Sequence, residues 1–349
     1  MKWIDPVFSK SKVRKAGDVL RGKHELTVNT SHAYEVLSNW RSAHAYPMHC
    51  LLVYLRRKSA EICSDPVVVQ RLKRSPSIVK KLRRISGMSL DRMQDIAGCR
   101  SVVSSLAEVE KLSSVIKKSR IRHLLHNEKD YISHPKESGY RCIHLVYKYN
   151  ATKEQYKNFF IELQIRSRIQ HAWATAVEVV DIFTKQALKA SYGQPEWKDF
   201  FRYVSAEFAR LEGAPVDERI SKIATRENIE ALEVKLAVMD RLRAFAVTTK
   251  HIEEQARRSY RYYLMVLEDR KNISVYRYEA KQIAEATEQY LRLETEYAKD
   301  DRADVVLVSG DSINNLRQAY PNYFADTEIF AKFYYEIVNR ANPSLNPTR

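Results

Sequence analysis

Hydrophobic positions recur with a helical period and with a strand period in different parts of the first half of the chain. Helical spacing covers 31–63, with an interruption at Pro47, and returns at 106–118 and 167–188. Alternation or short apolar runs predict strands at 95–105, 122–132, 141–149 and 158–166. This order of helices and strands predicts an α/β fold, a mixed α+β arrangement in which helices pack on one open sheet.

A second pattern begins after Gly213-Ala214-Pro215, which interrupts the first. A helical stretch is expected from about 217 to 248. Two strand-like runs at 259–268 and 272–279, joined by "DRKN", predict a hairpin. A helix at 280–299, a strand at 304–309 and two short helices complete a smaller α+β domain.

These patterns divide the chain into four parts. We expect a basic N-terminal segment at 1–30, an irregular one in part, and a main domain at 31–212. A linker helix at 213–250 then leads to a C-terminal domain at 251–349. Two domains also suit the length of 349 residues, which is more than one core usually serves.

Charge narrows the class of partner. Lys and Arg number 59 against 43 Asp and Glu, a formal net charge of +16, which favours nucleotides, nucleic acid or another polyanion. The first 19 residues carry charge throughout, and no stretch approaches the roughly 18 apolar residues of a membrane span. We therefore expect a soluble, cytoplasmic protein with no membrane partner. Its four cysteines show no metal-ligand spacing.

The block "RLKRSPSIVKK" gathers cations around the start of a short predicted helix. Arg71, Lys73 and Lys81 surround Ser77, which is expected to cap the helix. Because a helix N-terminus offers free N–H groups and partial positive charge, the block is a candidate phosphate site. The alternative is an ordinary solvated basic face.

The block "IELQIR" places three polar side chains on one face of a strand. Glu162, Gln164 and Arg166 follow at period two, and the intervening apolar residues face the core. Burial of such a face is costly unless it binds something. An exposed polar sheet face with an ordinary ion pair is the alternative.

A second carboxylate lies in "DIAGCR", where Asp95 precedes a glycine turn and Arg100 enters a strand. Asp95 and Glu162 could share Mg²⁺ with nucleotide phosphates, since Mg²⁺ usually takes only one or two carboxylates from a protein. The chain has no P-loop and no glycine-rich kinase loop, so phosphate transfer would not follow either of those classes.

The stretch "PKESGYRCIHLVY" brings ligand-binding side chains to a loop that enters a strand. Lys136 can reach phosphate, Tyr140 offers a ring for stacking, and Arg141 and His144 can bond polar edges. Arg141 and His144 should point to opposite faces, so only one should face the ligand beside Glu162. A purely structural role for His144 is the alternative.

Together the blocks "RLKRSPSI", "DIAGCR", "PKESGYRCIHL" and "ELQIRSRIQHAWA" resemble, in order and spacing, the synthetase domain of the RelA/SpoT family, over about 40–188. The resemblance implies a nucleotidyltransferase-like fold that transfers the β,γ-pyrophosphate of ATP to a ribose hydroxyl. It assigns Asp95 and Glu162 to Mg²⁺ and catalysis. It assigns to ATP binding Arg71, Lys73, Ser77, Lys81 and Arg100, and to acceptor binding Lys136, Tyr140, His144, Gln164 and Arg166.

The C-terminal half resembles the fused toxin–antitoxin branch called CapRel, through the Y-x-x-Y of Tyr320 and Tyr323 around Pro321. That resemblance implies an antitoxin-like domain that occludes the ATP site, tRNA 3′ ends as acceptor, and a phage protein as activator. The alternative is that both tyrosines are core aromatics. A second Y-x-x-Y at Tyr260 and Tyr263 shows that the motif alone does not decide.

Three hypotheses follow. The first is a tRNA-modifying, translation-inhibiting enzyme restrained by its own C-terminus. The second is a small alarmone synthetase acting on GDP or GTP, with a regulatory C-terminal domain. The third is an inactive nucleotide- or RNA-binding sensor, against which the presence of Asp95, Glu162 and Tyr140 argues. The sequence leaves the oligomeric state open.

Overall fold

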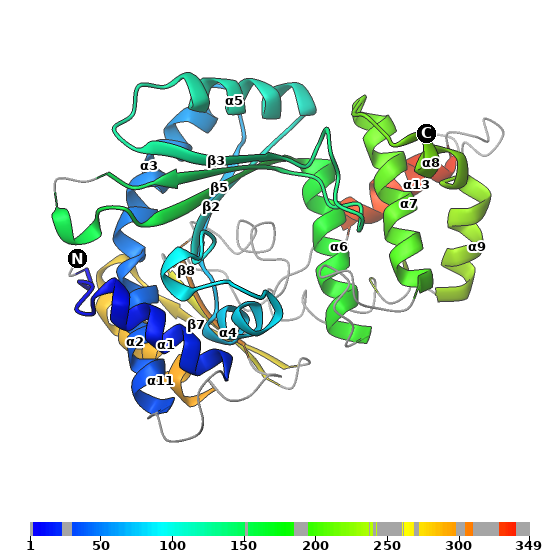
Figure 1. Cartoon of the computed structure of the whole chain (residues 1–349). Helices are drawn as coiled ribbons and strands as arrows, with labels where there is room; N and C mark the ends of the chain where they lie inside the picture. Colours follow the sequence, from blue (N-terminus) through cyan, green and yellow to red (C-terminus); the bar gives the residue numbers. More distant parts are fainter. Residues whose placement is uncertain are drawn as a thin grey trace.

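The computed structural model contains a five-stranded sheet, a three-stranded sheet and helices around both (Figure 1). It describes residues 3–22, 30–150, 153–184, 195–236, 238–239, 242, 260, 262–268, 272–297, 304–309 and 328–339. The mixed α/β class predicted from the sequence is confirmed.

The larger sheet has the order β1-β2-β5-β4-β3, with β2 and β5 parallel and the other neighbours antiparallel. Its strands are β1 (Val67–Leu72), β2 (Ala97–Val103), β3 (Leu124–Asp130), β4 (Ile143–Lys148) and β5 (Phe160–Ser167). Strand β1 was not predicted, although its run "VVVQRL" after Pro66 is rich in β-branched residues.

One face of this sheet carries the main hydrophobic core. Helices α3 (Ala45–Ala60) and α5 (Leu106–Lys118) cover that face in Figure 1, and Leu145 and Leu163 lie fully buried beneath them. Alternation on β5 sends Ile161, Leu163 and Ile165 into this core, as predicted. The polar residues of β5 therefore project from the opposite face.

The N-terminal segment, expected to be irregular in part, contains a helix. Helix α1 (Lys10–Arg21) is capped by Ser9 and ends at Gly22. Val13 and Leu20 are buried on one side of it, at the spacing of an amphipathic helix. They share a cluster with α2 (Thr30–Ala43) and α4 (Ser75–Arg84), so this segment belongs to the body of the fold. Short 3-10 helices lie at Leu90–Arg92, Glu154–Tyr156 and Ala280–Gln282.

A helical wall with an aromatic core stands at one end of the sheet (Figure 1). Its helices are α6 (Arg168–Thr184), α7 (Pro195–Glu212), α9 (Arg226–Leu236) and α13 (Glu328–Asn339), and α8 (Glu218–Ile223) contacts α7. Phe330 and Tyr334 of α13 pack against Phe200 and Phe208 of α7. Helix α13 thus packs into the helical wall, although it lies within 251–349, the range predicted to form a C-terminal domain. The division of the chain into these domains stays a prediction.

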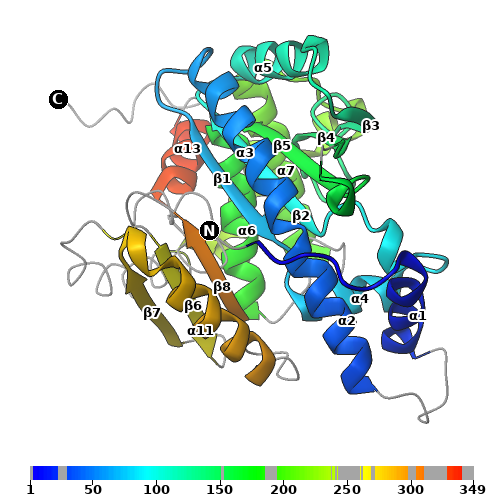
Figure 2. The same ribbon diagram turned by 90° about the vertical axis from the view of Figure 1, so that its left-hand side faces the viewer.

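The smaller sheet has the order β7-β6-β8 and packs against α11 (Ile283–Glu296). Strands β6 (Tyr262–Glu268) and β7 (Asn272–Tyr278) pair antiparallel, which confirms the predicted hairpin. Strand β8 (Asp304–Ser309) pairs with the other side of β6. Figure 2 shows β8 as the strand of the smaller sheet that lies nearest to β1, and residues of β8 and β1 are in contact.

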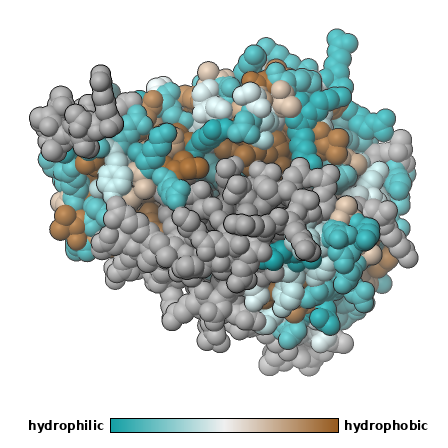
Figure 3. Space-filling view, turned by 180° about the vertical axis from the view of Figure 1, so that it is seen from behind, coloured by the Kyte–Doolittle hydropathy of each residue, from teal (hydrophilic) through white to brown (hydrophobic). Residues whose placement is uncertain are grey.

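Polar side chains cover most of the described surface on the side opposite to Figure 1 (Figure 3). Among the described residues, no helix combines the length and apolarity that a membrane crossing requires.

A partly buried polar contact joins α11 to the main domain. Glu294 Oε1 accepts hydrogen bonds from the backbone N (3.3 Å) and Oγ (3.0 Å) of Ser75, the first residue of α4. Its Oε2 lies 3.8 Å from Nη2 of the buried Arg41. The Arg41 guanidinium also lies 5.2 Å from the ring centre of Tyr290, one turn before Glu294. A carboxylate thus occupies the positive end of α4.

We predict that Glu294→Ala loosens the α11 unit from α4. A hydrogen bond to a charged group is worth about 1.5–3 kcal/mol, so backbone amides of α11 should exchange at least about tenfold faster with deuterium. Glu296→Ala, at an exposed position of the same helix, is the control and should leave exchange unchanged. Equal exchange in the two variants would show that the contact does not hold the unit.

Candidate active site

The polar face of the large sheet assembles two rows of side chains from its five strands. One row consists of Arg71, Gly98, Glu162, Val146 and Asn127, which are direct neighbours across β1, β2, β5, β4 and β3. The second row, in the same order of strands, consists of Val69, Arg100, Gln164, His144 and Lys129. All ten residues line one cavity of about 510 Å³.

The cavity is strongly basic. Eight of its lining residues are Lys or Arg, whereas three are acidic: Asp95, Glu162 and Glu178. Cations come from the sheet, from α4 and from the loop before β4, while Glu178 comes from α6. Such a concentration of cations around a few carboxylates suits a polyphosphate ligand.

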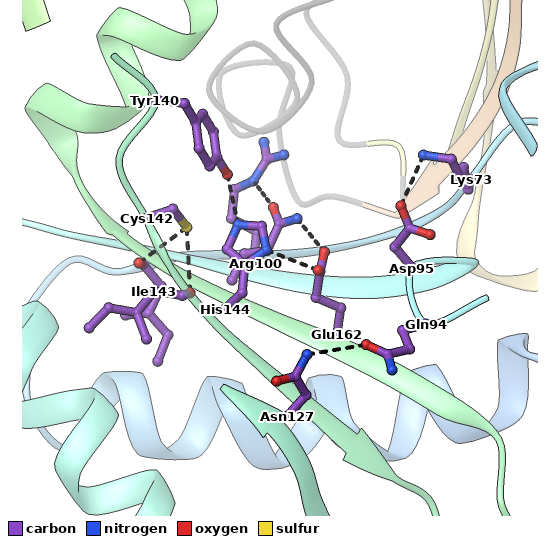
Figure 4. A network of polar contacts seen from close by, with 12 residues as sticks. Lys73, Gln94, Asp95, Arg100, Asn127, Tyr140, Cys142, Ile143, His144 and Glu162 are labelled. Carbon is purple, nitrogen blue, oxygen red and sulfur yellow. Dashed lines mark hydrogen bonds and ion pairs between the residues drawn. The ribbon is translucent and has the colours of Figure 1, made fainter. Parts of the chain in front are cut away.

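A chain of hydrogen bonds crosses the cavity floor (Figure 4). His144 Nε2 lies 2.9 Å from the Tyr140 hydroxyl, and its Nδ1 lies 2.9 Å from Glu162 Oε1. Gln164 then donates through Nε2 to Glu162 Oε2 at 2.6 Å. Its Oε1 accepts from Arg100 Nε at 3.3 Å. The network links predicted acceptor-side residues to a predicted ATP-side residue through Glu162.

The His144–Glu162 pair keeps the carboxylate ionised. Burial opposes the charge on Glu162, but His144 and the Gln164 amide together outweigh burial, so the pKa of Glu162 falls below its usual value. Burial likewise opposes charge on His144, yet Tyr140 and Glu162 raise the pKa of the imidazole well above 6.5. The two ring nitrogens of His144 join Glu162 to Tyr140, so this histidine is part of the cavity network rather than an isolated core residue.

Asp95 is held by two lysines. Lys73 Nζ lies 3.2 Å from Oδ2 and Lys81 Nζ lies 2.8 Å from Oδ1. Burial raises the pKa of Asp95, but the two ammonium groups together lower it to about 2. The charge of Asp95 in turn raises the pKa of Glu162, so the two carboxylates influence each other across the cavity.

These carboxylates fit a magnesium ion shared with phosphate. Among the described residues, no three His, Cys, Asp or Glu side chains gather as a complete metal site. Asp95, in the turn before β2, and Glu162, on β5, could supply the one or two carboxylates that Mg²⁺ usually takes from a protein.

Helix α4 begins earlier than predicted. Ser77 is not its cap: Arg74 holds that position, and the helix starts at Ser75 because Pro76 suits the first turn. Ser75 N donates to Glu294, Pro76 has no N–H, and Ile78 N donates to Arg74 O. Ser77 still lines the cavity.

The loop before β4 is a tight turn pressed against α7. Gly139 N donates to Lys136 O at 2.8 Å, and Gly139 has a φ of +88°. Ser205 Oγ of α7 donates to Gly139 O at 2.5 Å. The Lys136 ammonium lies 4.9 Å from the ring centre of Tyr140, which is half-buried rather than fully exposed. The helical wall thus holds the predicted acceptor loop.

Arg141 and His144 separate as their spacing predicted. Arg141 turns away and donates through Nη1 to Ile132 O at 2.7 Å, a structural contact. Arg166 lines the cavity at its buried base and contacts His171 of α6. Burial, with Arg100 nearby, lowers the pKa of Arg166 to about 9.

Sequence reasoning missed six polar residues that line the cavity: Gln70, Gln94, Asn127, Lys129, Tyr131 and Glu178. Asn127 and Lys129 do follow period two on β3, but only the strand order shows which face they share with Glu162. Tyr320 and Tyr323, the predicted regulatory pair, lie outside the described residues.

Comparison with known proteins points to one family for the segment that carries these residues. Residues 70–182 match the "Region found in RelA / SpoT proteins". GTP pyrophosphokinase YjbM of Bacillus subtilis is 35% identical over 111 residues, which cover 31% of this chain and 52% of that protein. GTP pyrophosphokinase YwaC of the same organism is 30% identical over 112 residues, covering 30% and 52%.

Among solved structures, the small alarmone synthetase 1 of Bacillus subtilis bound to its product pppGpp is 27% identical. The match covers 51% of this chain and 92% of that chain, with a TM-score of 0.40. The chain spans about half the length of the curated relatives it matches. The predicted RelA/SpoT resemblance of this segment is confirmed, and the CapRel resemblance of the C-terminal half stays a prediction.

We predict that Gly139→Ala destabilises the protein more than Gly22→Ala does. Both glycines have a positive φ, +88° and +85°, so both substitutions strain the backbone. Only at Gly139 would the new Cβ meet a neighbour, the Cβ of Ser205 at 2.8 Å. Overpacking typically costs about 1–3 kcal/mol, so the free energies of unfolding in urea should differ by that amount. Equal losses would mean that α7 does not restrain the loop.

Proposed function

We propose that this protein is a Mg²⁺-dependent pyrophosphokinase that transfers the β,γ-pyrophosphate of ATP to a ribose hydroxyl. The observation that carries the proposal is the cavity in which Asp95 and Glu162 stand among cations, within the segment that matches RelA/SpoT proteins. The names of the similar Bacillus proteins, GTP pyrophosphokinases, support the same reaction class.

The donor side is assigned to the cations around Asp95. Lys73 and Lys81 can turn from Asp95 to the phosphates, and Arg71 and Arg100, on β1 and β2, line the same cavity. In phosphoryl-type transfer the protein contributes chiefly position and charge neutralisation, which these side chains supply. Bound Mg²⁺, held by Asp95 and Glu162, would add charge neutralisation on the phosphate oxygens.

Glu162 is assigned to the attacking hydroxyl. Its carboxylate faces the cavity between Gln164 and His144, whose hydrogen bonds fix its orientation. It can accept a hydrogen bond from the hydroxyl and take its proton as the new bond to the β-phosphorus forms and the bond from that phosphorus to the departing AMP breaks. Because its pKa is lowered, Glu162 is a weak base, and orientation of the hydroxyl is the larger part of its role.

The acceptor side is assigned to the loop that α7 holds. Lys136 and Tyr140 stand at the cavity edge, and His144 joins Tyr140 to Glu162. A nucleoside whose base packs on Tyr140 would bring its ribose toward Glu162. This places acceptor recognition and the reacting carboxylate in one hydrogen-bonded unit.

We propose the 3′ end of tRNA as the acceptor and GDP or GTP as the alternative. The net charge of +16 and the excess of cations in the cavity favour a ligand with many phosphates. The Bacillus relatives are named for GTP, which favours the alternative. An inactive sensor is disfavoured, because both carboxylates and their hydrogen-bond partners are in place.

The C-terminal unit is proposed to restrain the enzyme. Glu294 occupies the N-terminus of α4, beside the lysines assigned to ATP, and Arg41 and Tyr290 complete this contact. Tyr320 and Tyr323 are proposed to add to this block. On the CapRel resemblance alone, we propose a translation-inhibiting toxin of phage defence whose activator is a phage protein that binds this unit.

We predict that Glu162→Gln lowers transfer at least about 100-fold, because it removes a carboxylate that orients and deprotonates the hydroxyl. The assay follows γ-³²P-labelled ATP with Mg²⁺ and three acceptors: GDP, GTP and deacylated tRNA. Glu128→Gln is the control, because Glu128 pairs with Lys117 outside the cavity.

The same assay tests the acceptor. Label on intact tRNA, and not on tRNA lacking its 3′-terminal adenosine, would support the tRNA proposal. Label on GDP or GTP would support the alarmone alternative. The proposed function would be contradicted if neither the unaltered protein nor the Glu294→Ala variant, in which the C-terminal unit is released, labels any acceptor.

We predict that Tyr140→Ala weakens acceptor use about 5- to 150-fold, since base stacking is worth about 1–3 kcal/mol. Tyr140→Phe keeps the ring and loses only the contact with His144, so its effect should be small. The measurement is kcat/KM for the acceptor at saturating ATP. Equal losses in the two variants would show that the hydroxyl, and not the ring, is what the acceptor site uses.

A further inference from the structure

The two carboxylates assigned to Mg²⁺ have unequal partners. Glu162 contacts one imidazole and one neutral amide, at 2.9 Å and 2.6 Å. Asp95 contacts two ammonium groups, one at each oxygen, at 3.2 Å and 2.8 Å. The side chains of Asp95, Lys73 and Lys81 are between 21% and 26% exposed, so solvent screens their charges only in part.

We propose that the ion pairs of Lys73 and Lys81 with Asp95 prevent a divalent metal from binding this carboxylate until a polyphosphate binds the two lysines instead. A divalent cation that approaches Asp95 meets two ammonium groups already paired with the carboxylate. Because the site is partly buried, the positive charges of the metal and the two lysines repel each other strongly. The metal therefore binds together with the nucleotide, and not before it. This inference rests on the proposed function and adds the order in which its ligands bind.

The backbone of both lysines is fixed, while their side chains can turn. Lys73 N donates to Ile96 O and Lys73 O accepts from Arg41 Nε, each at 2.7 Å. Lys81 lies on α4, which is anchored by the fully buried Ile78 and Leu82. A lysine carries its charge on a flexible four-carbon stem, so each ammonium can exchange a carboxylate for a phosphate without movement of the fold.

Phosphate is the partner that can win this exchange. Lys73, Lys81 and Arg71 line the cavity together, so a polyphosphate there meets all of them at once. As the ammonium groups turn to phosphate, Asp95 recovers a free carboxylate beside new phosphate oxygens, which are the ligands that Mg²⁺ prefers. By linkage, metal must then tighten nucleotide binding by the factor by which nucleotide tightens metal binding.

The test measures binding of Mn²⁺, used in place of Mg²⁺, by the loss of the free-ion electron paramagnetic resonance signal in the full-length protein without nucleotide. The unaltered protein should bind Mn²⁺ weakly. Lys73→Met with Lys81→Met should bind it at least about tenfold more tightly, because the competing cations are gone. Adding Asp95→Asn to the double variant should abolish the gain.

Lys80→Met is the matched control, since Lys80 is an exposed neighbour on the same helix and should leave Mn²⁺ affinity unchanged. If the double variant does not fold, Lys81→Met alone provides the comparison. In the unaltered protein, calorimetric titration with the non-hydrolysable α,β-methylene ATP should show at least about tenfold tighter binding with Mg²⁺ than without it.

The inference is overturned if the unaltered, nucleotide-free protein binds Mn²⁺ at Asp95 as tightly as the lysine variants do. It is also overturned if Mg²⁺ leaves the affinity for the ATP analogue unchanged. Neither readout depends on transfer. If the enzyme is active and either of these results is found, the blocking role of the lysines is rejected and the proposed function is kept. If metal and nucleotide binding are coupled but no acceptor is labelled, the proposed function is rejected and the blocking role is kept.

Discussion

The parallel pairing of β2 with β5 is the constraint on which the site depends. It sets Gly98 beside Glu162 and Arg100 beside Gln164, in the middle of the five-stranded sheet. A side chain at position 98 would crowd this pairing, because its Cβ would lie 3.3 Å from the backbone oxygen of Glu162. Side chains alternate between faces, so the same register that buries Leu163 in the core turns its polar neighbours into the cavity.

Burial of so many charges is tolerable because each central group has a partner. Unpaired buried charges are costly, and their pairing removes most of that cost. Asp95 has two lysines, and Glu162 has His144 and Gln164. These internal partners also keep both carboxylates ionised, which is the state that a metal or a hydroxyl proton requires. The ligand must therefore replace existing contacts rather than enter an empty charged space.

The C-terminal third of the chain contacts both sides of this site. Helix α13 joins the aromatic core of the helical wall, whose α7 holds Gly139 in the acceptor loop. Helix α11 contacts the other side, where Glu294 bonds the first residue of α4. One segment therefore supports the loop that carries Lys136 and Tyr140, and another occupies the N-terminal end of the helix that carries Lys81. Changes in the C-terminal part can thus reach both sides of the cavity.

The sequence by itself determined most of the local elements and which polar side chains share a face of one strand. Alternation on β5 placed Glu162, Gln164 and Arg166 on one face, and four motifs in order pointed to the RelA/SpoT resemblance. Only the tertiary structure decided which residues meet across elements. It added Asn127 and Lys129 to the site and built the network from Tyr140 to Arg100. It also placed Glu294 at the start of α4. Spacing along one element follows from its own backbone geometry, whereas these contacts join residues up to 219 positions apart and depend on strand order and helix docking.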